Sequence, residues 1–217
     1  QRACRRRRKN QIKSFQKLNG QITVNNMEME VMTTYFYKDL YTSEGVHNME
    51  EVLRHVPTKV TSEMNDILNA PYTYEEVKCA LFQMFPIKAP GPDGYPAHFF
   101  QRHWEVCGND VTKAVLRIVE GTESTTCINE TVLVLIPKVK NPTLLALFRP
   151  ISLCTVLYKV IAKCLANRLR PMLGEIISIN QSAFVPGRLI TDNALVAFEC
   201  FHFIEQNKKP EKTFCAY

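Results

Sequence analysis

The chain has 217 residues, of which 46% are hydrophobic and 22% are charged, and its formal net charge is +6. The length suits one large domain or two small ones, and the composition is that of a globular protein. No apolar run approaches the roughly 18 residues that a membrane span requires, so we expect no membrane partner.

The cysteines indicate an intracellular protein with reduced thiols. Eight cysteines are scattered along the chain without a CxxC pair, and no apolar signal segment begins it. His98, His103 and Cys107 are too few and too loosely spaced to predict a zinc site. The chain begins with Gln1 and ends within an apolar run, so we expect both ends to be cut.

The positive charge is concentrated at the N-terminus. The first 27 residues carry a net charge of +8, and the remainder carries −2. The densest part is a run of five cations, Arg5, Arg6, Arg7, Arg8 and Lys9. Such an arm is typical of non-specific nucleic-acid binding, of a nuclear-localisation patch or of a solvated flank, and charge alone leaves these open.

Short elements are predicted in the first 71 residues. Asn19-Gly20 lies between two strand-like runs and predicts a hairpin with a type I′ turn. Asn25 or Asn26 is expected to cap a helix that ends near Leu40. Its apolar stripe, which we expect in the core, consists of Val31, Met32, Tyr35, Phe36 and Leu40. Two further short helices are expected, over residues 49–55 and after Ser62, the second anchored by Ile67 and Leu68.

A capping box and a stiff loop organise the next segment. Thr73 and Glu76 predict a helix that buries Val77, Ala80, Leu81 and Met84 and stops at Pro86. Residues 88–96 hold three prolines and two glycines, which exclude regular structure and predict a rigid loop. An aromatic helix over residues 97–106 should end at Gly108. Another helix is expected over residues 111–120.

Residues 132–153 are expected to form two strands around a basic turn. The run 132–136 is apolar and β-branched, as in a strand covered on both faces, and Pro137 ends it. Arg149-Pro150 introduces the second strand, residues 151–153. Lys138 and Arg149 at this junction suit a grip on an anion, although a solvated hairpin tip would carry the same charges.

Helices dominate the remaining sequence. Residues 155–170 predict a long helix that buries Leu157, Val160, Ile161, Cys164, Leu165 and Leu169, with Lys159, Lys163, Arg168 and Arg170 on its other sides. Residues 172–177 form a short helix, and residues 180–188 a second stiff loop. Thr191 or Asp192 caps a last helix to about Gln206, with Ala194, Ala197, Phe198, Phe201 and Ile204 inward. A strand starts at Thr213. The predicted fold class is α+β, mostly helical.

Three motifs stand in a fixed order: KAPGPDG at 88–94, IPK to FRPISL at 136–153, and NQSAFVPGR with ITDN at 180–193. In this order and spacing they resemble the reverse transcriptases of non-LTR (LINE-type) retrotransposons, most closely those of plants. The likeness runs from about Tyr72 to the end of the chain. Residues 5–40 resemble the linker that precedes the polymerase in these elements.

The resemblance implies a right-handed polymerase fold, of which this chain holds the fingers and the start of the palm. Residues 1–71 would be the basic arm and linker, and residues 72–217 the fingers and the edge of the palm. By motif position, Lys138 and Arg149 lie near the incoming nucleotide's phosphates. Gln181, Phe184 and Arg188 lie at the template and nucleotide pocket, although core packing would also explain Phe184.

The expected partners are an RNA template, a DNA primer and deoxynucleoside triphosphates, and the expected compartment is the nucleus. The full-length family member uses Mg²⁺ held by aspartates, including a YxDD pair. This sequence has five aspartates, none adjacent, and no YxDD. We therefore expect no metal ligands or catalytic residues here, and a fragment that is inactive alone. The alternatives are a nucleic-acid-binding remnant without catalysis and an unstable product of a decayed element.

Overall fold

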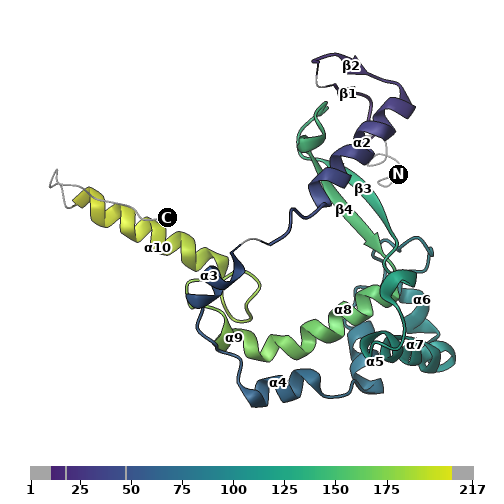
Figure 1. Ribbon diagram of the computed structural model, residues 1–217, viewed down its shortest axis with the longest axis vertical. Helices are drawn as coiled ribbons and strands as arrows, with labels where there is room; N and C mark the ends of the chain where they lie inside the picture. Colours follow the sequence, from purple (N-terminus) through teal and green to yellow (C-terminus); the bar gives the residue numbers. More distant parts are fainter. Residues whose placement is uncertain (1–10, 18, 47, 207–217) are drawn as a thin grey trace.

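The computed structural model describes residues 11–17, 19–46 and 48–206. Its elements form a helical body from which a β-hairpin and a C-terminal helix project (Figure 1). The strands are β1 (Phe15–Gln16), β2 (Ile22–Thr23), β3 (Thr131–Pro137) and β4 (Phe148–Cys154). The helices are α2 (Asn26–Tyr41), α3 (Met49–Arg54), α4 (Ser62–Asn69), α5 (Tyr74–Phe82), α6 (Ala97–Arg102), α7 (Trp104–Val119), α8 (Val156–Leu169), α9 (Leu173–Ile176) and α10 (Ile190–Gln206). Short 3₁₀ turns occupy Thr125–Cys127, Leu145–Leu147 and Arg170–Met172. The α+β, mostly helical class is confirmed, while the predicted strand at Thr213 lies outside the described residues.

The helical body is built around α5, α7 and α8. Thr73 and Glu76 form the predicted capping box at the start of α5, which ends at Phe82 instead of reaching Pro86. The main core consists of Val77, Ala80, Leu81, Ala97, Trp104, Val115, Val156, Val160 and Cys164. The predicted stripe of α8 is therefore correct at its centre, but Leu165 and Leu169 are exposed.

Gly108 lies within α7 and does not end a helix as predicted. The chain turns earlier, at His103, which separates α6 from α7. A Cβ on Gly108 would lie 2.7 Å from Cε2 of Trp104, so the absent side chain makes room for the indole ring. Helix α7 instead ends before Gly121, which has φ +74° and donates to the carbonyl of Ile118.

Strands β3 and β4 form one antiparallel hairpin in which Ile136 pairs with Arg149 and Pro137 with Phe148. The hairpin is confirmed, but β4 begins three residues earlier than predicted and contains Pro150. Both strands of a two-stranded hairpin are edges, and an edge tolerates proline. Among the described residues the hairpin is covered on one face only, so the predicted cover on both faces of the first strand is not found there.

The N-terminal segment covers that one face. A second cluster joins Phe15, Met29, Tyr37, Leu145 and Phe148, and partly buried Leu133 and Leu135 pack against it. The rings of Phe15 and Phe148 meet edge to face, with centroids 5.7 Å apart. Residues on both sides of the predicted boundary at 71 thus share one core.

Two local predictions for this segment need correction. Helix α2 has the predicted Asn25 cap, but Val31, Tyr35 and Leu40 are exposed and Met29 and Tyr37 are buried instead. The β1–β2 loop closes through hydrogen bonds from Gly20 N to Lys17 O and from Lys17 N to Gln21 O. With Gly20 at φ +84°, this is a three-residue loop and not the two-residue type I′ turn.

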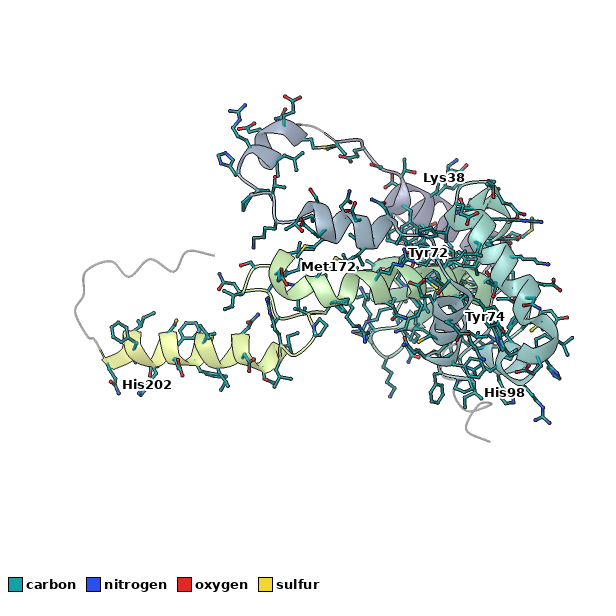
Figure 2. The ribbon with its side chains drawn as sticks, turned by 90° about the horizontal axis from the view of Figure 1, so that it is seen from below. Lys38, Tyr72, Tyr74, His98, Met172 and His202 are labelled. Carbon is teal, nitrogen blue, oxygen red and sulfur yellow. The ribbon has the colours of Figure 1, made fainter. Side chains whose placement is uncertain are left out.

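Helix α10 extends away from the body in both views (Figures 1 and 2). It contains no buried residue, and Phe198 and Phe201 are exposed. The prediction that its apolar face turns inward is therefore wrong for the described chain. The helix begins at Ile190, so Thr191 and Asp192 lie in its first turn and neither is the predicted N-cap. Asp192 instead accepts a hydrogen bond at 3.4 Å from the backbone N–H of Leu189, the residue before the helix.

Candidate functional site

In the part of the chain that the structure describes, the β3–β4 hairpin has one covered and one uncovered face. Side chains alternate along a strand, so Leu133 and Leu135 share the face that the N-terminal cluster covers. The register places Val132, Val134, Ile151 and Arg149 on the opposite face. Val132 and Ile151 are about half exposed there. The uncovered face is a mostly apolar surface that carries Arg149 near the loop end.

Lys138 lies on the same face as Arg149. It follows Ile136, the partner of Arg149, by two residues, and its N–H donates to the carbonyl of Leu147, which continues the ladder. Both cations are exposed. The Lys138 ammonium donates to the carbonyl of Ala146 at 2.8 Å and keeps two further N–H groups. The structure thus brings together the two residues predicted to grip phosphates.

Arg188 fastens the loop that contains the third motif. Its guanidinium donates to four backbone carbonyls, those of Gly174, Ile177, Ser178 and Gln181. Five N–H donors in a rigid fork make arginine suited to such a cluster. Arg188 therefore shapes this loop in the described chain, and its predicted contact with template or nucleotide stays a prediction.

Phe184 stands out from the loop that Arg188 fastens. Its side chain is 99% exposed and its φ is +64°, a left-handed conformation that costs a non-glycine residue free energy. Core packing is therefore excluded among the described residues. Gln181 is exposed as well. Ser182 is buried, and its hydroxyl has no hydrogen-bond partner among the described residues.

A pocket with polar and apolar lining residues lies beside this loop. It has a volume of about 670 Å³ and is lined by Ile179, Asn180, Ser182, Arg188, Asp192, Asn193 and Val196. This size falls within the range of small-ligand pockets. Sequence reasoning placed a pocket in this motif but did not name Ser182, Asn193 or Val196, which become neighbours only when α10 follows the loop.

The loop of the first motif is seated on the junction between β4 and α8. A Cβ on Gly91 would lie 2.5 Å from the backbone nitrogen of Thr155 and 2.6 Å from the carbonyl carbon of Cys154. Only glycine permits this approach of two backbones. Lys159 of α8 donates from its ammonium to Ala89 O at 3.2 Å. The first and second motifs therefore form one continuous structure.

Arg168 holds α4, α5 and α8 together, although the sequence placed it on a solvated side of its helix. Its side chain is 8% exposed and donates to both carboxylate oxygens of Glu76, at 2.7 and 2.9 Å. It also donates to the carbonyls of Leu68, Ala70 and Pro71 at the end of α4. The prediction that Arg168 lies on an outer side of its helix is therefore wrong. The carboxylate of Glu76 and the backbone carbonyls accept the hydrogen bonds that water would accept from an exposed guanidinium.

Arg168 lies against an aromatic ring, and the pKa values of two groups near it are shifted. Its guanidinium lies 3.5 Å from the ring centre of Tyr72, which Figure 2 labels beside α8. Hydrogen bonds from Arg168 lower the pKa of Glu76. Burial raises the pKa of the Cys164 thiol to about 11. Arg168 is four residues from Cys164 and eight from Val160, which is the spacing that could have identified it as buried.

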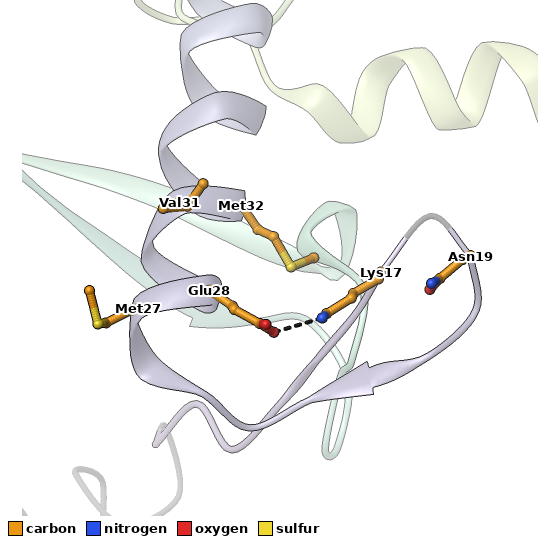
Figure 3. Close-up of a pocket in the computed structure, with 6 residues that line it drawn as sticks. All are labelled: Lys17, Asn19, Met27, Glu28, Val31 and Met32. Atoms are coloured by element: carbon orange, nitrogen blue, oxygen red, sulfur yellow. Dashed lines mark ion pairs between the residues drawn. The ribbon is translucent and has the colours of Figure 1, made fainter.

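The predicted cationic arm, Arg5 to Lys9, lies outside the described residues. Lys17, the last cation of the basic N-terminal segment, is paired: its ammonium lies 2.7 Å from a carboxylate oxygen of Glu28. These two residues line a pocket of about 640 Å³ with Met27, Val31 and Met32 (Figure 3). The charge of Lys17 is therefore compensated by Glu28, whereas a cation that binds phosphate in a basic arm would have to be unpaired.

Residues 136–216 match the family described as reverse transcriptase (RNA-dependent DNA polymerase). Over 170 residues, 77% of the chain, the sequence is 33% identical to the "Transposon TX1 uncharacterized 149 kDa protein" of Xenopus laevis. The chain belongs to the non-LTR retrotransposon reverse transcriptases. This confirms the resemblance drawn from the motifs. The chain spans 13% of the length of that Xenopus protein.

Reverse transcriptases as a family use Mg²⁺, and the aspartates described here do not fit a two-metal centre. Across residues 11–17, 19–46 and 48–206, no three His, Cys, Asp or Glu side chains gather to hold an ion. The five aspartates are distributed over separate elements, as Asp39, Asp66, Asp93, Asp110 and Asp192. Asp93 accepts from the N–H of Tyr95 in its own loop.

Within the part of the chain that the structure describes, no helix is long and apolar enough to cross a membrane.

Proposed function

We propose that this chain forms the template- and nucleotide-binding part of an RNA-directed DNA polymerase. In this proposal residues 72–217 are the fingers and the edge of the palm, and residues 1–71 are the arm and linker. The single observation that carries it is the uncovered hairpin face on which Lys138 and Arg149 lie together. The template, primer and nucleotide partners are those of the family.

The two cations suit the phosphates of an incoming nucleotide. Arginine can hold two phosphate oxygens at once, and lysine adds a compact point charge. Negative charge spreads over phosphate oxygens during phosphoryl transfer, so positive groups fixed beforehand are what this step requires. The hydrogen bond from Lys138 to Ala146 keeps the ammonium at the hairpin's loop end, beside the face of Arg149.

Template and base contacts are assigned to the neighbouring loop. Phe184 presents an exposed ring, and base–aromatic stacking is worth about 1–3 kcal/mol per base. Gln181 is exposed beside it and can donate or accept a hydrogen bond. Arg188 acts as a positioning residue, because its hydrogen bonds to four carbonyls fix the loop that carries Phe184.

The chain is proposed to bind without catalysing. Nucleotidyl transfer by this family needs carboxylates that hold divalent ions, and the aspartates on separate elements do not supply them. A primer-extension assay with the purified 217-residue chain, Mg²⁺ and a labelled primer on an RNA template should give no product. Magnesium-dependent extension would overturn this part of the proposal.

The binding part is tested with fluorescent deoxynucleoside triphosphate and a primer–template duplex. The double variant Lys138→Gln, Arg149→Gln should bind nucleotide at least tenfold more weakly than the wild-type chain. Lys113→Gln, at an exposed position of α7, is the matched control for loss of a cation, and thermal melting checks that the variants are folded. Equal nucleotide affinity for wild type and the double variant would reject the phosphate grip.

A further inference from the structure

A second basic site lies at the foot of the hairpin, away from Lys138 and Arg149. It is a pocket of about 400 Å³ between the end of α5, the loop of the first motif and the first turns of α8. Its lining is Gln83, Met84, Phe85, Lys88, Ala89, Ala97, Val156, Lys159 and Lys163. Nothing in the function proposed above uses this pocket.

The pocket carries uncompensated positive charge. Lys88, Lys159 and Lys163 line it, and its lining contains no aspartate or glutamate. The ion pairs of the described residues, Lys17–Glu28 and Arg168–Glu76, involve none of the three lysines. Like charges gathered around one cavity repel one another, and a bound anion offsets that repulsion. The site is therefore suited to a ligand with several negative charges.

The pocket is preformed. Gln101 donates from its side-chain amide to the carbonyls of Leu81 and Met84, at 2.9 and 3.0 Å, and so holds the segment that leads to Lys88. The N–H of His98 donates to Pro86 O at 3.0 Å in the same segment. On the other side of the pocket, the close approach of Gly91 to Cys154 and Thr155 holds the loop of the first motif against the start of α8. A ligand would meet these lysines already in place, which lowers the ordering cost of binding.

The wall of the pocket is apolar and partly aromatic. Met84, Ala97 and Val156 contribute aliphatic surface, and Phe85 is 60% exposed. Cations beside an accessible aromatic ring are the combination that binds single-stranded nucleic acid, because phosphates meet the cations and bases stack on the ring. A free inorganic phosphate would leave the apolar wall unused.

We propose that Lys88, Lys159 and Lys163 bind the phosphodiester backbone of a single nucleic-acid strand. The proposal rests on the proposed function and deepens it, since it assigns a strand path beyond the nucleotide site. Strand β4 connects Arg149 to Cys154 over about 17 Å at roughly 3.3 Å per residue, and α8 begins directly after it. A strand that passes the hairpin face can thus reach the pocket along the same segment.

Fluorescence anisotropy tests the assignment with labelled oligo-U RNA and oligo-dT DNA over a range of salt concentrations. In Lys88→Gln, Lys163→Gln, the contact from Lys159 to Ala89 is kept and two cations are removed. Each phosphate contact to a single strand contributes about 0.7 to the slope of log K against log salt, so the slope should become shallower by about 1.4. Lys113→Gln should leave it unchanged. Melting temperatures verify that the variants fold.

The outcomes separate this inference from the proposed function. One outcome is a salt slope of oligonucleotide binding that is unchanged in Lys88→Gln, Lys163→Gln and shallower in Lys138→Gln, Arg149→Gln. That result would reject binding at the three-lysine pocket and would still support the hairpin site. Absence of oligonucleotide binding by the wild-type chain would overturn both. Polyglutamate that displaces the oligonucleotide equally well at equal charge concentration would overturn the nucleic-acid assignment, because an acidic peptide would then fit the pocket.

Discussion

Arg168 of α8 and Glu76 of α5 form a bidentate ion pair across a separation of 92 residues in the chain. Glu76 also accepts from the backbone N–H of Thr73 as part of the capping box, at 2.9 Å. One carboxylate therefore caps α5 and anchors α8. Arg168 in turn satisfies carbonyls at the end of α4, which otherwise lack partners. Three helices depend on this pair.

Replacing Arg168 by lysine should lower the free energy of unfolding by about 2–4 kcal/mol. The lysine keeps the charge but cannot make two parallel bonds to Glu76 and also reach the carbonyls of α4. Urea unfolding followed by circular dichroism measures the loss. Arg170→Lys, in an exposed position, is the matched control and should stay within about 0.5 kcal/mol of wild type. Equal midpoints for both variants would contradict the role of Arg168.

Stability should decline in acid because the folded-state pKa of Glu76 is lowered from 4.5, chiefly by hydrogen bonds from Arg168. A carboxyl with a lowered folded pKa stabilises the fold above its unfolded value. That contribution is lost as the pH falls below about 4.5 and through the lowered folded value. Urea midpoints between pH 7 and pH 3 should fall less in Glu76→Gln than in wild type. Glu75→Gln should follow wild type, and parallel curves for all three proteins would refute the linkage.

Gly91→Ala should destabilise the chain by about 1–3 kcal/mol, because the added methyl group meets the backbone of Cys154 and Thr155, which cannot rotate away. Thermal melting should show the lower midpoint. Gly174→Ala is the matched control: nothing lies within 4 Å of its Cβ position, so no loss is expected. If Gly91→Ala melts like wild type, the loop is not seated on the junction as described. The same variant should also weaken oligonucleotide binding at the three-lysine pocket.

The cationic arm is best tested by removing residues 1–10. A longer deletion to residue 17 would remove Phe15, which is 1% exposed, and uncover Phe148. Loss of phosphate contacts by Arg5 to Lys9 should make the salt slope of nucleic-acid binding shallower by about 0.7 to 0.9 per contact. An unchanged slope in a normally melting deletion variant would exclude the arm as a binding element.

Local signals in the sequence predicted the local structure well. The Asn25 cap, the Thr73–Glu76 capping box and the apolar run ending at Pro137 each depend on residues within a few positions of one another. Each is present in the structure. The motif order identified the family for the same reason, since it too can be read along the chain.

Long-range contacts were the part that the sequence could not provide. The apolar stripe of α2 was predicted correctly at Met32 and Phe36 but wrongly at Val31, Tyr35 and Leu40, because the choice between its apolar faces depends on residues far along the chain, Leu145 and Phe148. Arg168 was placed in solvent because its partner is on another helix. Lys159 and Lys163 were read as solvated helix charges, and only the fold brings Lys88 beside them.

The contact between Phe15 and Phe148 also sets an order of events during synthesis. Strand β1 and helix α2 leave the ribosome before the β3–β4 hairpin, which buries part of their surface and lies about a hundred residues further along the chain. Phe15, Met29 and Tyr37 therefore stay solvent-accessible through much of translation. Contacts of such high sequence separation slow folding and leave apolar surface open to aggregation or chaperone binding. Residues 15–37 are therefore made well before the residues against which they pack.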